Sequence, residues 1–306
     1  MNDLNLIYLA NVCAALILSP MLLGVIARVK AFFAGRHGIP VCQLYYDIFK
    51  LLKHNSVYST STSRMFKIAP AVTLAAVICA LLLLPCGEES SYFGFAGDML
   101  FFVYIFALAR GFTVLAAMDT ASSFEGMGSA RELHFAIFSE CALMAMLGVL
   151  CIYSGGEFSL SGIFLSLGER ETTGAIAPIA LLIAAAGFFM VMLAENCRVP
   201  ADDPETHLEL TMIHEAMILD YSGPDLAIIH YASALKLWVF GQLLVMMLFP
   251  HCHWWVIVPG VFASAVAVGV VESITARFRL LKVPHYLMGA FALELVALAL
   301  HIRECL

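Results

Sequence analysis

The sequence predicts an all-α, polytopic membrane protein with about eight transmembrane helices and additional cytoplasmic amphipathic helices. Hydrophobic residues make up 62% of the 306 positions and charged residues only 13%, with a mean hydropathy of +0.91. An average soluble domain has roughly 25% charged residues. The second observation is that apolar runs of about 20 residues, the length needed to span a bilayer as a helix, recur along the whole chain.

Charged residues or Gly and Pro bound eight such runs, and we find no linker or separate soluble domain between them. The chain is therefore expected to form a single transmembrane domain over residues 1–306. The first run is not predicted to be a cleaved signal peptide, because no basic residues precede it and no small-residue cleavage pattern follows. In order, the predicted spans are Leu6 to Ala27, Phe66 to Pro85, Asp98 to Met118, Leu133 to Ser154, Ala175 to Ala194, His230 to Pro250, Trp254 to Ser273 and Pro284 to Ile302.

The distribution of Lys and Arg predicts the orientation in a prokaryotic cell (inner) membrane. The second, fourth and sixth connections contain one basic residue, Arg170, whereas the first and seventh contain Arg28, Lys30, Arg36, Lys50, Lys53, Arg64, Lys67, Arg277, Arg279 and Lys282. By the positive-inside rule, the odd-numbered connections are cytoplasmic and both termini are outside.

Composition and motif searches argue against several other classes of protein. The net charge of −7 is spread over the loops with no basic tail, so nucleic acid is not an expected partner. The nine cysteines form no Cys-x-x-Cys pair, which argues against an iron–sulfur cluster or structural zinc on this chain. The His207/His214 and His251/His253 pairs lack a third ligand at a credible spacing, so no metal site is predicted.

The first cytoplasmic connection, residues 28–67, is predicted to contain an amphipathic helix. Apolar residues at Leu44, Tyr45, Ile48 and Leu52 recur at helical spacing, opposite polar residues that include Lys50. Such a helix lies at the membrane surface or packs beneath a partner subunit, and the pattern alone does not separate these two roles.

The fifth connection, residues 195–229, has the densest group of acidic residues in the sequence. Between Ala194 and Ala227 there are eight carboxylates and one arginine, Arg198. Asp203 as N-cap, Pro204 at the first helical position and Glu205 in the first turn predict a short helix. A solvated hairpin is the simple alternative, although a loop in water has no need of so one-sided a charge.

Ionisable residues also occur inside the predicted spans, where a carboxylate costs about 2.5–3.5 kcal/mol at mid-membrane. The carboxylates are Glu140, Glu195, Glu272 and Glu294, and the cations are Arg110 and Lys236. Buried acids with alternating cationic partners can relay protons. The alternative is that pairs such as Glu140 with Arg110, or Glu272 with Lys236, only lock helices together.

Residues of the first and fifth connections and of the fourth span resemble the signature of a known family, the NuoH-type membrane subunit at the heel of respiratory complex I. Arg131 and Glu140 have the family's spacing at the fourth span, and Tyr221-Ser222-Gly223 resembles the end of its signature loop. The remaining matches are Glu195, Arg198, Pro200, Asp202, Pro204, Glu205, Glu209 and Leu210 in the fifth connection, and Gly35, Arg36, Gly38, Pro40, Gln43, Asp47 and Lys50 in the first.

Two departures point to the hydrogenase branch of this family. His207 replaces an acid that is usual in the quinone-reducing enzymes, and the segment before Asp220 looks about three residues longer than theirs. The sequence looks instead like the membrane subunits of formate hydrogenlyase and hydrogenase-4, which belong with the group 4 NiFe hydrogenases. The departures argue against a bound quinone.

The resemblance implies a subunit without redox cofactors of its own. It would anchor a peripheral arm formed by a hydrogenase-like large subunit with the NiFe centre and a small subunit with iron–sulfur clusters, and pass protons toward antiporter-like membrane subunits. The implied proton path comprises Glu140, Glu195, Asp202, Asp203, Glu205, Glu209, Glu215, Asp220 and Glu272; Arg110, Arg131, Arg198 and Lys236 would tune these acids; and Arg36, Gln43, Asp47 and Lys50 would form the docking loop.

Three alternatives remain at this point. The chain could wall a quinone tunnel in a complex I-type NADH–quinone oxidoreductase, and a tunnel open to the bilayer or co-purified quinone would favour that reading. It could also be a stand-alone ion transporter, although we see no inverted repeat between its halves. A purely structural anchor would lose only assembly when the acids of the fifth connection are replaced by amides.

Overall fold

The computed structural model describes residues 3–87, 89–169, 177–203, 212–250 and 252–305, and within these residues every regular element is helical. Eight helices are long and apolar enough to cross a membrane, which confirms the predicted fold class. They are α1 (Asp3–Phe33), α3 (Arg64–Leu83), α4 (Asp98–Asp119), α5 (Ser123–Tyr153), α7 (Ala177–Glu195), α9 (Gly223–Leu248), α10 (Trp254–Ile274) and α11 (Val283–Cys305), the last preceded by the 3-10 turn η1 (Leu280–Lys282).

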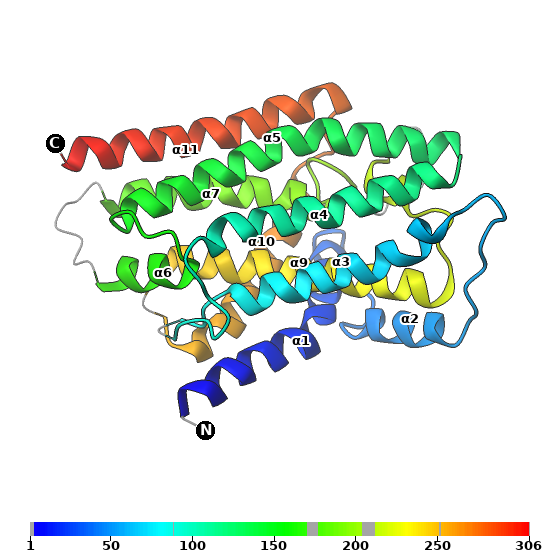
Figure 1. Ribbon diagram of the computed structural model, residues 1–306, viewed down its shortest axis with the longest axis horizontal. Coiled ribbons are helices and arrows are strands. Elements are labelled where there is room, and N and C mark those ends of the chain that lie inside the picture. Colours follow the sequence, from blue (N-terminus) through cyan, green and yellow to red (C-terminus); the bar gives the residue numbers. More distant parts are fainter. Residues whose placement is uncertain (1–2, 88, 170–176, 204–211, 251, 306) are drawn as a thin grey trace.

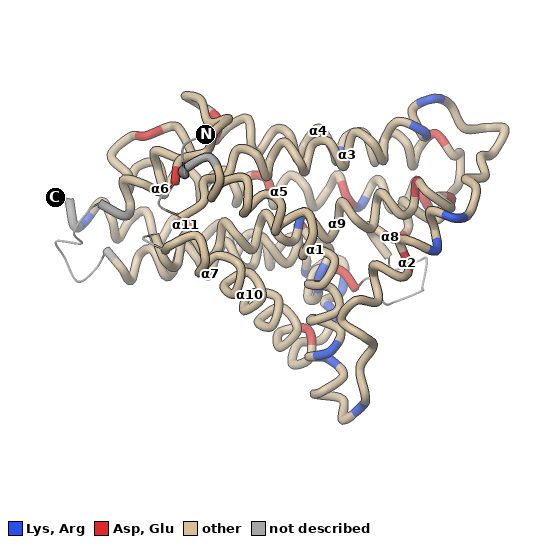
Figure 2. The backbone as a smooth tube through the Cα atoms, turned by 90° about the horizontal axis from the view of Figure 1, so that it is seen from below, with Lys and Arg blue, Asp and Glu red and all other residues tan. Residues whose placement is uncertain are grey.

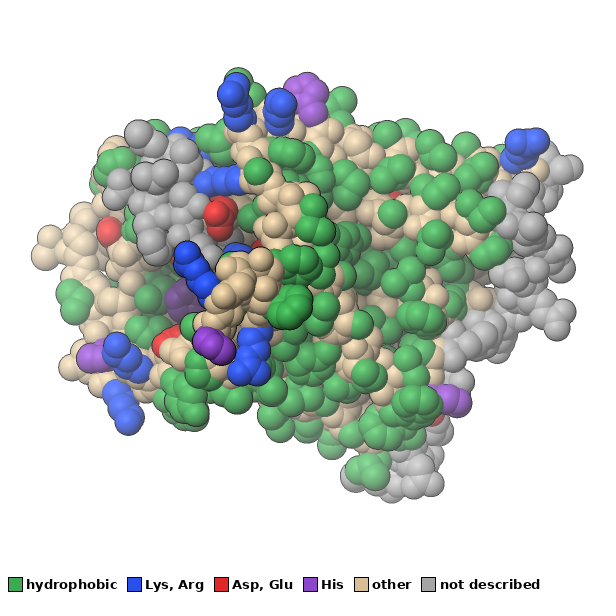
Figure 3. All heavy atoms as spheres, turned by 180° about the vertical axis from the view of Figure 1, so that it is seen from behind, with side chains coloured by type: hydrophobic (Ala, Val, Ile, Leu, Met, Phe, Trp, Pro, Cys, Tyr) green, Lys and Arg blue, Asp and Glu red, His purple; other side chains and the backbone are tan. Residues whose placement is uncertain are grey.

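The helices run along one direction, and both termini lie at the same end of the bundle (Figure 1). Helix α11 packs on α7 and α5, α3 packs on α4 and α9, and α1 packs on α10 and α9. The first connection, with α2, lies at the end opposite the termini. Most Lys and Arg residues also lie toward that end (Figure 2), and hydrophobic side chains cover the middle of the molecule (Figure 3).

Helix α9 is the central element, since most of its residues are buried between α1, α3, α7 and α10. Trp238 and Phe240 are fully buried there, and Phe240 stacks on Phe188 of α7 at a centroid distance of 5.8 Å. In a membrane such contacts stabilise the bundle through close packing rather than through removal of apolar surface from water.

Helix α5 begins at Ser123, well before the predicted span at Leu133, so the predicted start of the fourth span is wrong. Its first turns pack on the protein and not on lipid: Gly128 lies so close to α8 (His214–Met217) that an added Cβ would be 3.0 Å from Ala216 Cβ. The extension is stabilised by the fifth connection, which contributes no apolar run that the sequence pattern could show.

The predicted amphipathic helix of the first connection is α2 (Gln43–Leu52), which contacts α9 and α1. A second short helix, α6 (Leu160–Glu169), follows α5 and was not predicted. Its start is held by Asp98 at the beginning of α4, whose carboxylate accepts hydrogen bonds from the Leu160 N–H at 2.6 Å and the Ser159 hydroxyl at 3.2 Å.

The predicted helix from Asp203 cannot be compared with the structure, because residues 204–211 lie outside the described residues. After them, Met212, Ile213, Ala216 and Met217 are buried against the bundle. The described end of the fifth connection is therefore packed onto the protein, which argues against the alternative of a solvated hairpin for this part.

Candidate functional site

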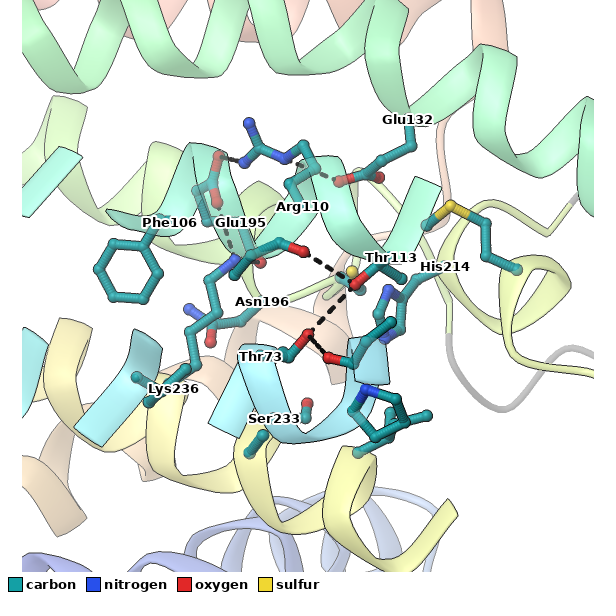
Figure 4. A pocket seen from close by; sticks show the side chains of 18 of the residues that line it. Thr73, Phe106, Arg110, Thr113, Glu132, Glu195, Asn196, His214, Ser233 and Lys236 are labelled. Carbon is teal, nitrogen blue, oxygen red and sulfur yellow. Dashed lines mark hydrogen bonds and ion pairs between the residues drawn. The ribbon is translucent and has the colours of Figure 1, made fainter. Parts of the chain in front are cut away.

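Arg110 on α4 brings three carboxylates together inside the bundle, and Figure 4 shows two of them, Glu132 and Glu195. Its Nε lies 3.1 Å from Glu132 Oε1 and its Nη2 lies 2.5 Å from Glu195 Oε1, while Nη1 donates to Glu140. The Arg110 side chain is 9% exposed and that of Glu195 2%, whereas the Glu140 side chain is 38% exposed. A guanidinium presents five N–H donors in a fixed plane, which suits it to hold several carboxylates at once.

Lys236 on α9 is the second cation of this cluster. Its Nζ donates to Glu195 Oε2 at 2.8 Å and to the backbone carbonyl of Glu195 at 2.7 Å. The Ser139 hydroxyl adds a third kind of donor to Glu195 at 2.7 Å, and Lys236 also lies 5.5 Å from the centre of the Phe106 ring. We call Arg110, Glu132, Glu140, Glu195 and Lys236 the charged cluster.

A cavity of about 80 Å³, the larger cavity, lies between α3, α4 and α9, and four members of the charged cluster line it: Arg110, Glu132, Glu195 and Lys236. Its polar lining residues include Thr73 and Thr113, whose hydroxyls are 3.4 Å apart, and His214. Its apolar lining residues include Val77 and Ile229. Each water needs roughly 10–15 Å³ in a cavity of this kind, so the larger cavity has room for several.

A smaller cavity of about 30 Å³ lies on the other side of Arg110 and Glu195. Asp202 of the fifth connection lines it, together with Leu287 at the start of α11. Asp202 Oδ1 lies 2.8 Å from Arg277 Nη2, and Asp202 also accepts the backbone N–H groups of Asp203 and His214. Burial raises the pKa of Asp202, while these hydrogen bonds and Arg277 oppose the shift. The smaller cavity is thus lined both by Asp202 and by three members of the charged cluster, Arg110, Glu132 and Glu195.

Glu272 belongs to a separate pair of contacts on α10. Its carboxylate lies 3.3 Å from Lys30 Nζ and 3.6 Å from Arg198 Nη1. The predicted pairing of Glu272 with Lys236 is wrong, because α10 packs against α1 and places Glu272 next to Lys30. The prediction that Arg198 accompanies one of the acids agrees with this geometry.

The other predicted residues have different surroundings. Arg131 donates to the backbone carbonyl of Met212 at 2.9 Å, so it holds the end of the fifth connection against α5. The Asp220 N–H donates to Glu125 at 3.1 Å. Glu215 lies in α8 and is partly exposed, and Glu205 and Glu209 lie outside the described residues.

In the docking loop, the Gln43 amide donates to Asp47 at 3.0 Å one turn along α2. Lys50 is in the last turn of the same helix, and Arg36 precedes it in an exposed turn. The helix with three of these residues, α2, lies at the end of the bundle opposite the termini (Figure 1), and none of the four lines a cavity of the charged cluster.

The first and fifth connections are fastened to each other at the start of α9. The Val57 N–H donates to the Ser222 hydroxyl at 3.0 Å, and Tyr58 donates to Asp225 at 2.6 Å. Gly223 has a φ of +58°, and a Cβ there would lie 2.9 Å from the Asn55 carbonyl, so the Tyr221-Ser222-Gly223 turn requires glycine. The two connections are therefore held in direct contact at this point.

Two acids of the site were missed from the sequence. Glu132 was placed in a loop because the fourth span was expected to begin at Leu133, yet it lies two turns from Glu140 on the same helix. Glu125 is fully buried and accepts a hydrogen bond from Thr120 as well as from Asp220. Its position two residues into α5 gave a signal, since an acid in a first turn is favoured by the helix dipole.

Among the described residues, no group of three or more His, Cys, Asp or Glu side chains is placed to hold a metal ion. His207 and His251 lie outside these residues. The chemistry that this arrangement supports is proton binding and transfer among carboxylates.

Comparison with known proteins decides the family. The family model for NADH dehydrogenase matches residues 6–302. The chain belongs to this family. Hydrogenase-4 component C of Escherichia coli (strain K12) is 30% identical over 243 residues, which cover 79% of this chain and 74% of that protein. Formate hydrogenlyase subunit 4 of the same organism is 26% identical over 291 residues, covering 91% and 92%.

A solved relative shares the fold of this member of the NADH dehydrogenase family. The membrane-bound sulfane sulfur reductase, an archaeal respiratory membrane complex, contains a chain with a TM-score of 0.81 at 18% identity, covering 97% of this chain and 99% of that one. The family predicted from the sequence is confirmed, and its hydrogenase-type members are among the similar proteins. These relatives are parts of multi-subunit membrane assemblies, and this chain is a multi-pass membrane protein.

Proposed function

We propose that this chain is the membrane-anchor and proton-coupling subunit of a group 4, energy-converting NiFe hydrogenase or formate hydrogenlyase-type complex. The similarity to the two Escherichia coli subunits supports the type of complex. The observation that carries the proton-coupling role is the arrangement of two cavities around Arg110 and Glu195, which join Asp202 to the charged cluster.

The geometry supports a specific order of events. A change of charge at the cytoplasmic surface acts first on Asp202, whose carboxylate is held by Arg277 and by two backbone N–H groups. Water in the smaller cavity connects Asp202 to Glu195, and Arg110 distributes its N–H donors over Glu195, Glu132 and Glu140. When one of these carboxylates gains a proton, it loses its charge and its ion pair with Arg110 weakens. Arg110 then interacts more strongly with the carboxylates that are still charged.

The exposed fraction of Glu140 supports lateral exit of the proton. Glu140 lies in the middle of α5, yet 38% of its side chain is exposed on the surface of this chain. A carboxylate facing lipid is costly, so we propose that an antiporter-like subunit covers it. The hydrogenase-like large subunit and the iron–sulfur small subunit would dock on the joined first and fifth connections, and the NiFe centre and clusters would reside in them.

We place the protein in a prokaryotic cell membrane with both termini outside. The positive-inside rule and the position of the Lys and Arg residues at the end opposite the termini support this orientation (Figure 2). Cysteine labelling with a membrane-impermeant thiol reagent tests it, using single cysteines placed at the exposed Lys53 and Glu157.

The test of the function is proton movement in proteoliposomes that contain the whole complex. Glu140→Gln and Asp202→Asn should leave the complex assembled and should abolish proton uptake that is coupled to electron transfer. Glu157→Gln is the matched control, because Glu157 is exposed in the connection between α5 and α6 and lines neither cavity. Normal proton uptake in both test variants would refute the proposal. Variants that form less of the complex, but whose assembled complex still takes up protons normally, would identify a structural anchor.

The quinone alternative has its own test. Small-molecule sites usually have volumes of about 300–1,000 Å³, whereas the larger cavity has about 80 Å³, which favours water over a quinone ring. Quinone that co-purifies with the complex and is reduced by it would favour the complex I-type reading instead.

A further inference from the structure

The buried face of α11 contains ionisable residues where apolar ones are expected. Its buried positions are spaced by four and three residues in alternation, the pattern of a helix that presents one narrow stripe to its neighbours. They are Val283, Leu287, Ala290, Glu294, Ala297 and His301. Glu294 lies in the middle of the span, in the stripe that faces α7 and α5.

Glu294 is fully buried, and neither of its carboxyl oxygens has a hydrogen-bond partner among the described residues. Gly187 of α7 provides the space for it, because a Cβ at that position would lie 2.6 Å from Glu294 Oε1. The carboxyl is therefore seated in the seam between α7 and α11, and it neither snorkels to water nor locks two helices through an ion pair.

The elements packed around the seam offer Glu294 no counter-ion. Helix α7 has one ionisable residue, Glu195, which is its last residue. On α5, Glu132 and Glu140 contact Arg110. A carboxylate without a cation or donor is strongly disfavoured in an apolar interior, whereas a neutral carboxylic acid needs only one acceptor for its O–H.

The same stripe extends from Glu294 to the smaller cavity, which members of the charged cluster line. Leu287 and Val283 line the smaller cavity beside Glu195 and Asp202. Glu294 lies two turns beyond Leu287, about 10 Å along the helix axis. At the other end, a further two turns along, the His301 ring stacks on Tyr153 of α5 with ring centroids 4.2 Å apart.

We propose that Glu294 is a proton-binding site in the membrane interior, which takes up a proton from the charged cluster through the smaller cavity and releases it toward His301. This chain would then contain a transmembrane proton branch of its own, in addition to the lateral exit at Glu140. The step moves a proton between two oxygen acids and requires no redox partner. The proposal rests on the proposed function, because the charged cluster supplies the proton.

The first experiment is infrared spectroscopy of the purified complex. The carbonyl stretch of a protonated carboxylic acid is separated from the amide and carboxylate bands and shifts in deuterium oxide. We expect such a band in the resting complex, its loss in Glu294→Gln, and its presence at a changed frequency in Glu294→Asp, which keeps the acid if the amide variant fails to assemble. The same carboxylic acid band in the wild type and in Glu294→Gln would overturn the proposal.

The second experiment asks whether the proton moves. Redox-difference infrared spectra of the wild type should contain the Glu294 band, and Glu294→Gln in proteoliposomes should reduce the protons moved per electron while hydrogen chemistry continues. A band absent from the difference spectrum, together with an unchanged proton ratio, would show a static acid and overturn the inference. Glu140→Gln separates the two proposals: normal coupling in that variant counts against the proposed function, whereas coupling lost in Glu140→Gln and kept in Glu294→Gln counts against this inference alone.

Discussion

Replacing Arg110 by methionine removes the cation that holds three carboxylates and leaves a side chain of similar length. Lys236 then remains as the cation beside Glu195, and Glu132 loses its ion pair. Breaking a buried ion pair by removing one partner costs about 3–5 kcal/mol. The alternative is that one carboxyl takes up a proton, which costs about 4 kcal/mol at pH 7 for an acid with an ordinary pKa of about 4.3. Both routes predict that the variant loses about 4 kcal/mol of unfolding free energy. Water screens the partly exposed Glu140, so the contribution of that carboxylate to the loss is smaller.

The pH dependence of this loss distinguishes the explanation from a simple packing defect. Folded Arg110→Met binds one more proton than its unfolded chain at neutral pH, so its stability falls as the pH rises and recovers as the pH falls. The recovery should be about 1.4 kcal/mol per pH unit between pH 7 and about pH 5. Denaturant unfolding in detergent at several pH values measures it, with Arg64→Met as the control because Arg64 is exposed at the start of α3. A variant as stable as the wild type at pH 7, or a loss that does not change with pH, would refute the reasoning.

Two further predictions concern Gly24 and Asp202. Gly24→Ala should destabilise the protein by about 1–3 kcal/mol, because the added Cβ would lie 2.1 Å from the Val41 carbonyl oxygen. Gly111→Ala is the control: its Cβ meets nothing within 4 Å, so the substitution should be neutral or slightly stabilising. Equal unfolding midpoints for the two variants would contradict this prediction. Burial raises the pKa of Asp202, so its contribution to stability is complete below the ordinary value of about 4 and is lost as the pH rises through the folded value. Asp202→Asn should therefore flatten the fall in unfolding free energy over that range, and an unchanged pH profile would show that Asp202 does not titrate there.

The spans could be predicted because hydrocarbon leaves a chain few choices. A run of about 20 apolar residues must satisfy its own backbone hydrogen bonds, and a helix does so. The same argument does not predict helical segments that pack on other parts of the protein. The first ten residues of α5 and the whole of α6 depend on contacts with distant segments, through Gly128 and Asp98 respectively.

The members of the charged cluster could be predicted more readily than their pairing. Arg110 and Glu140 stood out because charges inside apolar runs are costly, and the structure places them in contact. The error over Lys236 concerns helix faces, since α10 packs on both α9 and α1, and Glu272 lies on the face of α10 that meets α1 while Lys236 lies on the face of α9 that meets α7. Lys236 therefore meets Glu195, and Glu272 meets Lys30. Residue spacing carries no information on which helices are neighbours.

The composition of the charged cluster argues for proton exchange over a static lock. A lock is most stable when its charges balance, because any excess buried charge carries an uncompensated desolvation cost. Here Glu132, Glu140 and Glu195 face Arg110 and Lys236, so with every group ionised there is one negative charge more than the two cations neutralise. Binding one proton restores the balance, and losing it to a neighbour recreates the excess. The cluster thus has two states that differ by a single proton, and the cavities on both sides of Arg110 give water access to them.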